Sequence, residues 1–299
     1  MPIALNRGVR IHYEAHGSGV PILFIHEFAG DHRSWDDQVR HFGRGWRTIT
    51  MAARGYPPSD CPAEEAEYGQ RAFEADAIAV LDAAGVDRAH VVGLSMGGYT
   101  ALMLALRAPE RIRSVVAAGA GSGSALAGLD AFKAECRATA DRFEREGRID
   151  AEAMSLGPTR VQLAVKDPVG WSRSVGHLAE HPAHAAAKTL RTVQAGRPSL
   201  YELEAGLAAI TAPVLLMVGD EDEPCLDVNL WLKRTMPVAD LVVLPGTGHA
   251  INLEEPALFN AFVERFVVDV ERGAWRPRDP RARAIGTATS LGLGPARRD

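Results

Sequence analysis

The sequence lacks the features that mark membrane or secreted proteins, nucleic-acid-binding proteins, and proteins stabilised by disulfides or zinc. It contains no run of about 18 apolar residues, and its opening residues show no charged leader followed by an apolar stretch. Its formal net charge of −5 leaves no basic excess to attract nucleic acid. Its three cysteines, Cys61, Cys136 and Cys225, are too far apart in the sequence to suggest a disulfide framework or zinc knuckle. We therefore expect free thiols and a cytoplasmic protein with neither a nucleic-acid nor a membrane partner.

What is present indicates a globular chain, with 46% hydrophobic and 24% charged residues among 299. Short apolar runs alternate with helical patterns, which is typical of parallel strands joined by crossover helices. The alternation predicts an α/β fold with a doubly wound, mostly parallel sheet. The expected strands are residues 10–15, 21–26, 47–51, 90–94, 112–118, 213–218 and 241–244, and the expected helices include 69–84, 96–107 and 259–270.

This alternation stops in residues 125–210, which contain many helix formers and no convincing strand. Because strands resume at residue 213, we expect this segment to be a helical lid over the strand ends, inserted into a core formed by residues 1–124 and 211–275. A separate helical domain is the alternative. Residues 276–299 are rich in Arg, Pro and Gly, so we expect a loose or surface-draped tail.

The segment Gly93-Leu94-Ser95-Met96-Gly97 follows an expected strand and opens an expected helix. A serine on such a sharp turn needs very small residues two positions away on either side, and the two glycines meet that need. The N-terminus of the following helix directs partial positive charge at the site. This position indicates Ser95 as a nucleophile.

A serine nucleophile needs a base, and histidine, with a reference pKa of about 6.5, suits that task. Of the ten histidines, His249 is favoured because its loop follows the last expected strand and would emerge at the same sheet edge as Ser95. A carboxylate must orient the base, and Asp222 follows the strand at 213–218. The alternatives for that carboxylate are three neighbouring acids, Asp220, Glu221 and Glu223.

Five short segments, in the same order along the chain, resemble the α/β-hydrolase superfamily and within it the lidded serine esterase and lactonase-like branch. They are His26 to Gly30 with Trp35 behind it, Arg54 to Asp60, Gly93 to Gly98, Gly219 to Asp222, and Gly248 to Pro256. The resemblance covers residues 10–270. It implies that Ser95, Asp222 and His249 form a catalytic triad, and that the backbone N–H groups of Phe28 and Met96 form an oxyanion hole.

The chain departs from the family pattern at two positions. Glu27 stands where the family usually has Gly, and Ala52 stands where it usually has Asp. A carboxylate at position 27 could line the substrate pocket and favour a cationic or hydrogen-bond-donating substrate, or it could point into solvent. We expect the rest of the pocket wall to come from the lid, with Trp171, His177 and Trp231 as candidates.

No metal site is expected from these motifs. His26-Glu27 begins like a zinc-protease signature, but Gly30 stands where that motif needs a second histidine. His177, His181 and His184 are near helical spacing, but Pro182 interrupts the pattern and no further ligand completes it.

These inferences predict a cofactor-independent serine hydrolase that cleaves a small-molecule ester or lactone through an acyl-enzyme. Two alternatives use the same triad: cleavage of carbon–carbon bonds in β-diketones or meta-cleavage products, and amide hydrolysis or perhydrolysis. A ligand-binding receptor on the same scaffold is the alternative outside catalysis. The reference pKa of histidine predicts that activity falls below about pH 6 to 7, as His249 becomes protonated. The sequence does not indicate an oligomeric state.

Overall fold

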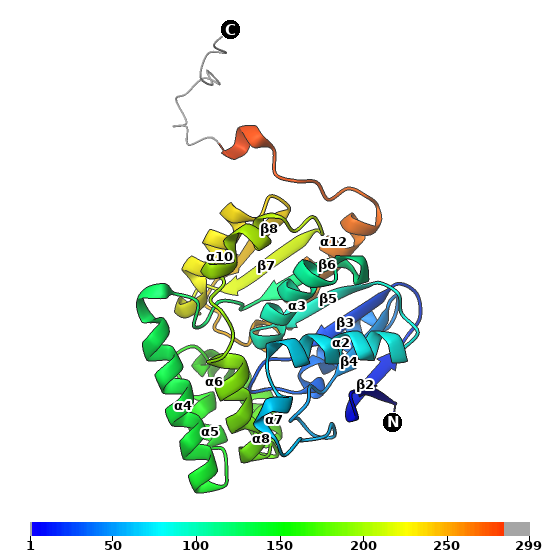
Figure 1. Cartoon of the computed structure of the whole chain (residues 1–299). Coiled ribbons are helices and arrows are strands. Elements are labelled where there is room, and N and C mark those ends of the chain that lie inside the picture. Colours follow the sequence, from blue (N-terminus) through cyan, green and yellow to red (C-terminus); the bar gives the residue numbers. More distant parts are fainter. Residues whose placement is uncertain (1, 284–299) are drawn as a thin grey trace.

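The computed structural model describes residues 2–283, and in it eight strands form one sheet in the order β1-β2-β4-β3-β5-β6-β7-β8 (Figure 1). Strands β3 to β8 run parallel to one another, whereas β2 pairs antiparallel with both β1 and β4. This arrangement confirms the expected mostly parallel α/β sheet. The strands are β1 (Ile3–Asn6), β2 (Val9–His16), β3 (Pro21–Ile25), β4 (Arg47–Met51), β5 (Ala89–Leu94), β6 (Ile112–Ala118), β7 (Val214–Gly219) and β8 (Ala239–Leu244).

Alternate residues of the central strands enter two different apolar layers, because successive side chains of a strand point to opposite faces. Leu23 and Val91 face the layer formed with α2 (Gln70–Ala83), α3 (Met96–Arg107) and α10 (Glu223–Thr235). Phe24 and Val92 face the layer formed with α1 (Asp36–Phe42) and α12 (Pro256–Glu271). Burial on both faces explains why these strands read as continuous apolar runs in the sequence.

The chain between β6 and β7 is helical, and we call residues 125–210 the cap. In Figure 1 helices α4 to α8 of the cap group together to one side of the sheet. The cap shares a buried apolar cluster with the core loops, in which Phe143 and Leu178 of the cap join Phe28 and Met96. Its elements are η4 (Leu126–Gly128), α4 (Leu129–Glu146), α5 (Ala151–Ser155), α6 (Val161–Lys166), α7 (Pro168–Ala179), α8 (Ala183–Thr189), η5 (Leu190–Gln194), η6 (Tyr201–Leu203) and α9 (Glu204–Ala208).

Trp275 and Arg278, near the end of the described residues, contact the core through hydrogen bonds. The N–H of Arg278 donates to the carbonyl of Pro237 at 2.9 Å, and the indole of Trp275 donates to the carbonyl of Val238 at 3.0 Å. Most of the expected tail, residues 284–299, lies outside the described residues. Within residues 2–283, no helix has both the length and the apolar character needed to cross a membrane. The remaining elements are η1 (His32–Trp35), η2 (Glu65–Glu67), η3 (Pro109–Arg111), α11 (Ile251–Glu254) and η7 (Pro280–Arg283).

Candidate active site

Ser95 lies at the sharp turn between β5 and α3, with a φ of 54° and a ψ of −111°. This positive φ is rare for a residue with a side chain, so the turn holds Ser95 in a strained conformation. A Cβ atom on Gly93 would overlap the carbonyl of Gly97, and a Cβ atom on Gly97 would overlap the carbonyl of Ile25. The turn therefore requires glycine at both positions. This is the steric requirement that the two glycines flanking Ser95 indicated in the sequence.

His249 and Asp222 are joined by a buried hydrogen bond. Nδ1 of His249 lies 2.7 Å from Oδ2 of Asp222, and the two side chains are 6% and 0% exposed. The sequence left four acids open for this role, from Asp220 to Glu223. In the described residues, Asp222 is the acid that contacts His249. Nδ1–H donates to the carboxylate, which leaves Nε2 as the nitrogen that can accept a proton.

The pKa of His249 depends on two opposing effects. Burial lowers it, but the charge of Asp222 and the hydrogen bond to its carboxylate outweigh burial and raise the pKa to about 10. The pKa that governs a base at this position is therefore higher than the reference value of histidine.

Ser95 and His249 lie at the same edge of the sheet. The N–H of Ser95 donates to the carbonyl of Ala118, the last residue of β6, at 2.7 Å. A Cβ atom on the next residue, Gly119, would lie 3.4 Å from Leu94 and 3.4 Å from Cε1 of His249. The imidazole thus lies beside the turn that carries Ser95. A hydrogen bond between the two side chains is not formed in the described residues, and such bonds often tighten only when substrate binds.

Glu254 and the cap hold the loop that carries His249. The Glu254 carboxylate accepts hydrogen bonds from the N–H of Gly248 at 2.7 Å and from the N–H of Ala250 at 3.2 Å. The N–H of His249 donates to the carbonyl of Thr159 in the cap at 2.7 Å. Glu254 enters the sequence interpretation only through the family motif, and no sequence pattern indicates Thr159. Both act through the loop backbone: Glu254 holds the residues on either side of His249, and Thr159 holds His249 itself.

The thiol of Cys225 lies beside the Asp222–His249 pair. Its Sγ is 3.3 Å from the carbonyl oxygen of Gly119 and 3.4 Å from Oγ of Ser122, and burial raises its pKa. The sequence predicted only that Cys225 is a free thiol, and all three cysteines are free in the structure. Its place near the site follows from α10, which begins directly after Asp222.

The loop after β3 carries Phe28 and is shaped by His26. Nε2 of His26 accepts from the N–H of Ala53 at 3.0 Å, and Nδ1–H donates to the carbonyl of Glu27 at 2.7 Å. Burial lowers the pKa of His26 to about 4, so the ring is neutral at pH 7 and keeps this hydrogen-bonding pattern. Met96 is the first residue of α3, so its N–H has no acceptor within the helix. The Phe28 and Met96 side chains meet in one buried cluster.

Glu27 does not point into solvent, so that alternative is wrong. Its side chain is 4% exposed and forms an ion pair with Arg160 of the cap. Burial alone would raise the pKa of Glu27, but Arg160 reverses the effect and lowers it. The carboxylate is therefore charged, and its charge is balanced. Because Arg160 follows Thr159, one short cap segment contacts both the Phe28 loop and the His249 loop.

A cleft beside the Phe28 and His249 loops is lined by both the core and the cap. Glu27, Trp171 and His177 are three of the four side chains expected in a pocket, and all three line this cleft. Trp231 does not belong to the lining. It lies on α10 against Tyr201, with ring centroids 4.4 Å apart, and packs on the apolar layer beneath α2 and α3. The expectation for Trp231 is wrong because α10 turns this side chain toward the sheet layer.

Comparisons with known proteins agree with this architecture. The model of a family described as the alpha/beta hydrolase fold matches residues 20–256. The chain is 28% identical over 279 residues to a 2-hydroxymuconate semialdehyde hydrolase of Pseudomonas sp. (strain CF600), covering 89% of this chain and 93% of the relative. It is 27% identical over 259 residues to a putative carbamate hydrolase RutD of Pseudomonas savastanoi pv. phaseolicola, covering 83% and 94% of the two chains.

Two solved structures are also similar. Est816, described as an N-acyl homoserine lactone degrading enzyme, has 28% identity and a TM-score of 0.76, with 89% of this chain and 100% of that chain covered. A thermophilic esterase from Thermogutta terrifontis has 24% identity and a TM-score of 0.79, with 90% and 98% of the two chains covered. The second likeness concerns the fold alone.

Proposed function

Because the chain belongs to the α/β-hydrolase fold family and matches relatives that are named as hydrolases, we propose that it cleaves a small carboxylic ester or lactone through an acyl-enzyme. The observation that carries this proposal is the buried hydrogen bond between Asp222 and His249, at the sheet edge where the strained turn presents Ser95. The three residue types, in this order along the chain, form the catalytic unit of acyl transfer.

In the proposed reaction, Nε2 of His249 takes the proton of Ser95 as the serine oxygen attacks the acyl carbonyl. The Asp222 carboxylate stabilises the imidazolium that forms. The N–H groups of Phe28 and Met96 donate to the developing oxyanion. His249 then protonates the leaving alcohol, and the same residue activates water to release the acid. These steps use only groups of this chain, so we propose no cofactor.

The cleft supports a small substrate that carries both apolar and polar groups, because Arg33, Arg160 and Arg173 line it as well. Apolar and aromatic side chains of the cap, such as Leu163 and Trp171, form part of its wall, which favours apolar groups of a ligand. The pairing of Glu27 with Arg160 removes the reason to expect selection for cationic substrates. The similarity to Est816, whose description names lactone degradation, supports the lactone form of this proposal.

Hydrolysis of a carbon–carbon bond is the second candidate. It is favoured by the relative named a 2-hydroxymuconate semialdehyde hydrolase, which is 28% identical to this chain. The acyl-transfer groups are common to both reactions, so the triad does not separate them. The choice depends on how the cleft binds the leaving group.

The proposal is tested by treating the purified protein with a fluorophosphonate and locating the adduct by mass spectrometry. We expect one adduct, on Ser95, that is lost in Ser95→Ala and kept in Ser172→Ala, a matched substitution of an exposed serine on the cap. A parallel panel of p-nitrophenyl esters, lactones, dienoic diketones and anilides identifies the bond that is cleaved. An adduct elsewhere contradicts the proposal. Tight ligand binding with turnover that Ser95→Ala does not change would support the receptor alternative.

A further inference from the structure

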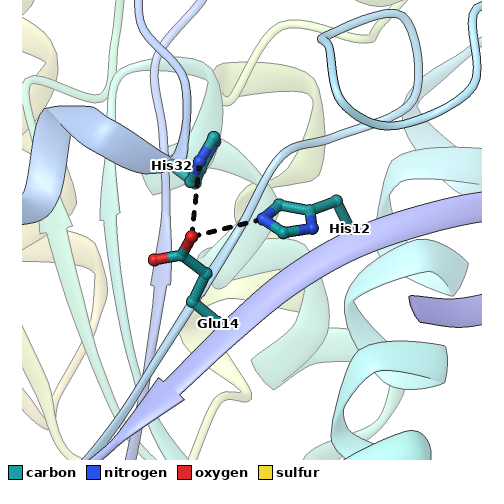
Figure 2. Close-up of side chains that lie close together, drawn as sticks. All are labelled: His12, Glu14 and His32. Atoms are coloured by element: carbon teal, nitrogen blue, oxygen red, sulfur yellow. Dashed lines mark ion pairs between the residues drawn. The ribbon is translucent and has the colours of Figure 1, made fainter. Parts of the chain in front are cut away.

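A second group of titratable side chains lies between β2 and η1, and the proposed catalytic steps do not use it. His12, Glu14 and His16 alternate along β2, so their side chains project from one face of that strand. His32 is the first residue of η1. In Figure 2 the carboxylate of Glu14 lies between the imidazole rings of His12 and His32.

The distances within this group suit a small ion. Oε1 of Glu14 lies 3.5 Å from Nε2 of His12 and 3.9 Å from Nε2 of His32. One ligand atom of each of the three residues lies within 4.8 Å of the others. Bonds of about 2.0–2.2 Å in a tetrahedral zinc site place ligand atoms roughly 3.3–3.6 Å apart. Small rotations of the side chains would bring the three groups to that spacing.

His12 gives independent evidence for a ligand at this place. Its side chain is 1% exposed, yet among residues 2–283 neither of its ring nitrogens has a hydrogen-bond partner. Buried polar atoms without partners are rare because they lose their hydration and gain nothing in return. A metal ion would satisfy one of these two nitrogens.

His32 also has a buried ring nitrogen without a hydrogen-bond partner among the described residues. This nitrogen is Nδ1, which lies 3.6 Å from Oδ1 of Asp31. Histidines that bind a metal through one nitrogen usually direct the other toward a carboxylate, which orients the ring.

We propose that His12, Glu14 and His32 bind a divalent transition-metal ion of the zinc type. Two imidazoles and one carboxylate are donors that zinc accepts, whereas calcium and magnesium prefer oxygen ligands alone. His16, whose Nε2 lies 3.5 Å from the other oxygen of Glu14, lies outside this group of three. The ion would link β2 to η1, the element that follows the loop carrying Phe28.

Metal binding is tested on the full-length chain, purified without a histidine tag and freed of metal with a chelator. Titration with zinc chloride in a calorimeter should show one bound ion per chain, and zinc should raise the melting temperature. Cobalt(II) bound in place of zinc should give the visible absorption of a tetrahedral site with nitrogen and oxygen ligands. The absence of both heat and a melting shift at about 100 µM zinc overturns the proposal.

Substitutions identify the ligands. Glu14→Ala and His32→Ala should each weaken zinc binding by about tenfold or more, while His184→Ala, at an exposed histidine of α8, is the matched control and should keep the affinity. Glu14 is the decisive position, because its side chain is 37% exposed and its replacement leaves the buried His12 in place. Equal affinity in Glu14→Ala and the parent chain contradicts the proposed ligand set.

A second trio must be distinguished, because Asp222, Cys225 and His249 also place ligand atoms within 4.8 Å of one another. Cobalt bound there would show the strong near-ultraviolet band of a thiolate ligand, and Cys225→Ser would abolish that band. We expect no such band and unchanged zinc affinity in Cys225→Ser. Loss of zinc binding in this variant, with binding kept in Glu14→Ala, assigns the ion to the catalytic pair and overturns the proposal.

Discussion

The core sheet and the cap are stabilised in different ways. Every residue of β5 and β7 is buried, and the two faces of the sheet are covered by separate apolar layers. The cap instead leaves Val165 and Val169 69% and 80% exposed. Polar contacts add to the apolar cluster that joins it to the core, among them the pairs Arg160–Glu27 and His181–Asp31. The comparison indicates that the core positions the reacting groups, and that the cap depends on a few individual contacts.

The largest effect is expected in the core. Ser95→Ala should lower kcat for an ester substrate by about 10⁴-fold or more, because no other group replaces the attacking oxygen. Stopped assays with the variant and the parent enzyme at saturating substrate measure the ratio. Circular dichroism should show that the variant is folded. A loss smaller than about tenfold would mean that the reaction does not pass through Ser95.

The pH dependence tests the Asp222–His249 pair. The base must be neutral, and Asp222 raises the pKa of His249, so kcat/KM should rise with pH and reach half its maximum above the reference value of about 6.5. As the pH falls, activity should therefore be lost at a higher pH than the reference pKa of histidine suggests. Asp222→Asn should lower activity by about 10⁴-fold.

Asp222→Asn also provides a control on the pH at which activity reaches half its maximum. With the charge of residue 222 removed, burial and the charge of Arg160 lower the pKa of His249 against only the hydrogen bond to Cys225, so the midpoint of the residual activity should fall. A midpoint in the parent enzyme at or below about 6.5 would be inconsistent with the raised pKa.

The contact between cap and core is tested by Glu27→Gln. Arg160 would lose its charged partner, so the free energy of unfolding should fall by about 3 kcal/mol. Urea denaturation followed by tryptophan fluorescence measures this change. Glu180→Gln is the matched control, because Glu180 pairs with Arg33 but is 60% exposed, and it should cost at most about 1 kcal/mol. Equal losses of the free energy of unfolding in the two variants would show that the buried pair stabilises the protein no more than the exposed pair does.

The smallest effect is expected for the cleft wall. Trp171→Ala should raise KM by about tenfold with little change in kcat, because the side chain lines the cleft and takes no part in the proposed chemical steps. Trp231→Ala is the comparison in the core. It should leave KM unchanged and lower the melting temperature, since Trp231 packs against Tyr201. Steady-state kinetics of both variants with one ester substrate distinguishes the two roles.

Much of the fold could be predicted because its signals are local. The predicted strand at residues 112–118 coincides with β6, and the helix at residues 96–107 coincides with α3. Buried strands are continuous apolar runs, and Pro109 ends the helical pattern after α3. The strand β1, with four residues, was not predicted. It is too short to show a period, and its pairing with β2 defines it.

Partners that are distant in sequence could not be predicted. Glu27 and Arg160 are 133 positions apart, and no local pattern connects a residue of the Phe28 loop to one cap arginine. The alternation of His12, Glu14 and His16 is visible in the sequence, but His32 joins them only after the chain has crossed β3 and the following loop. The contacts of Trp231 depend equally on how α10 rotates against the sheet.

By itself the sequence determined the parallel sheet, the turn that presents Ser95, and the order in which Ser95, Asp222 and His249 follow their strands. These features depend on steric limits and burial within a few residues, so neighbouring residues suffice to specify them. The tertiary structure alone decided which acid meets His249, that Arg160 neutralises Glu27, and that His12 and His32 lie on either side of Glu14. Those contacts arise only when the order of the strands and the docking of the cap bring distant segments together.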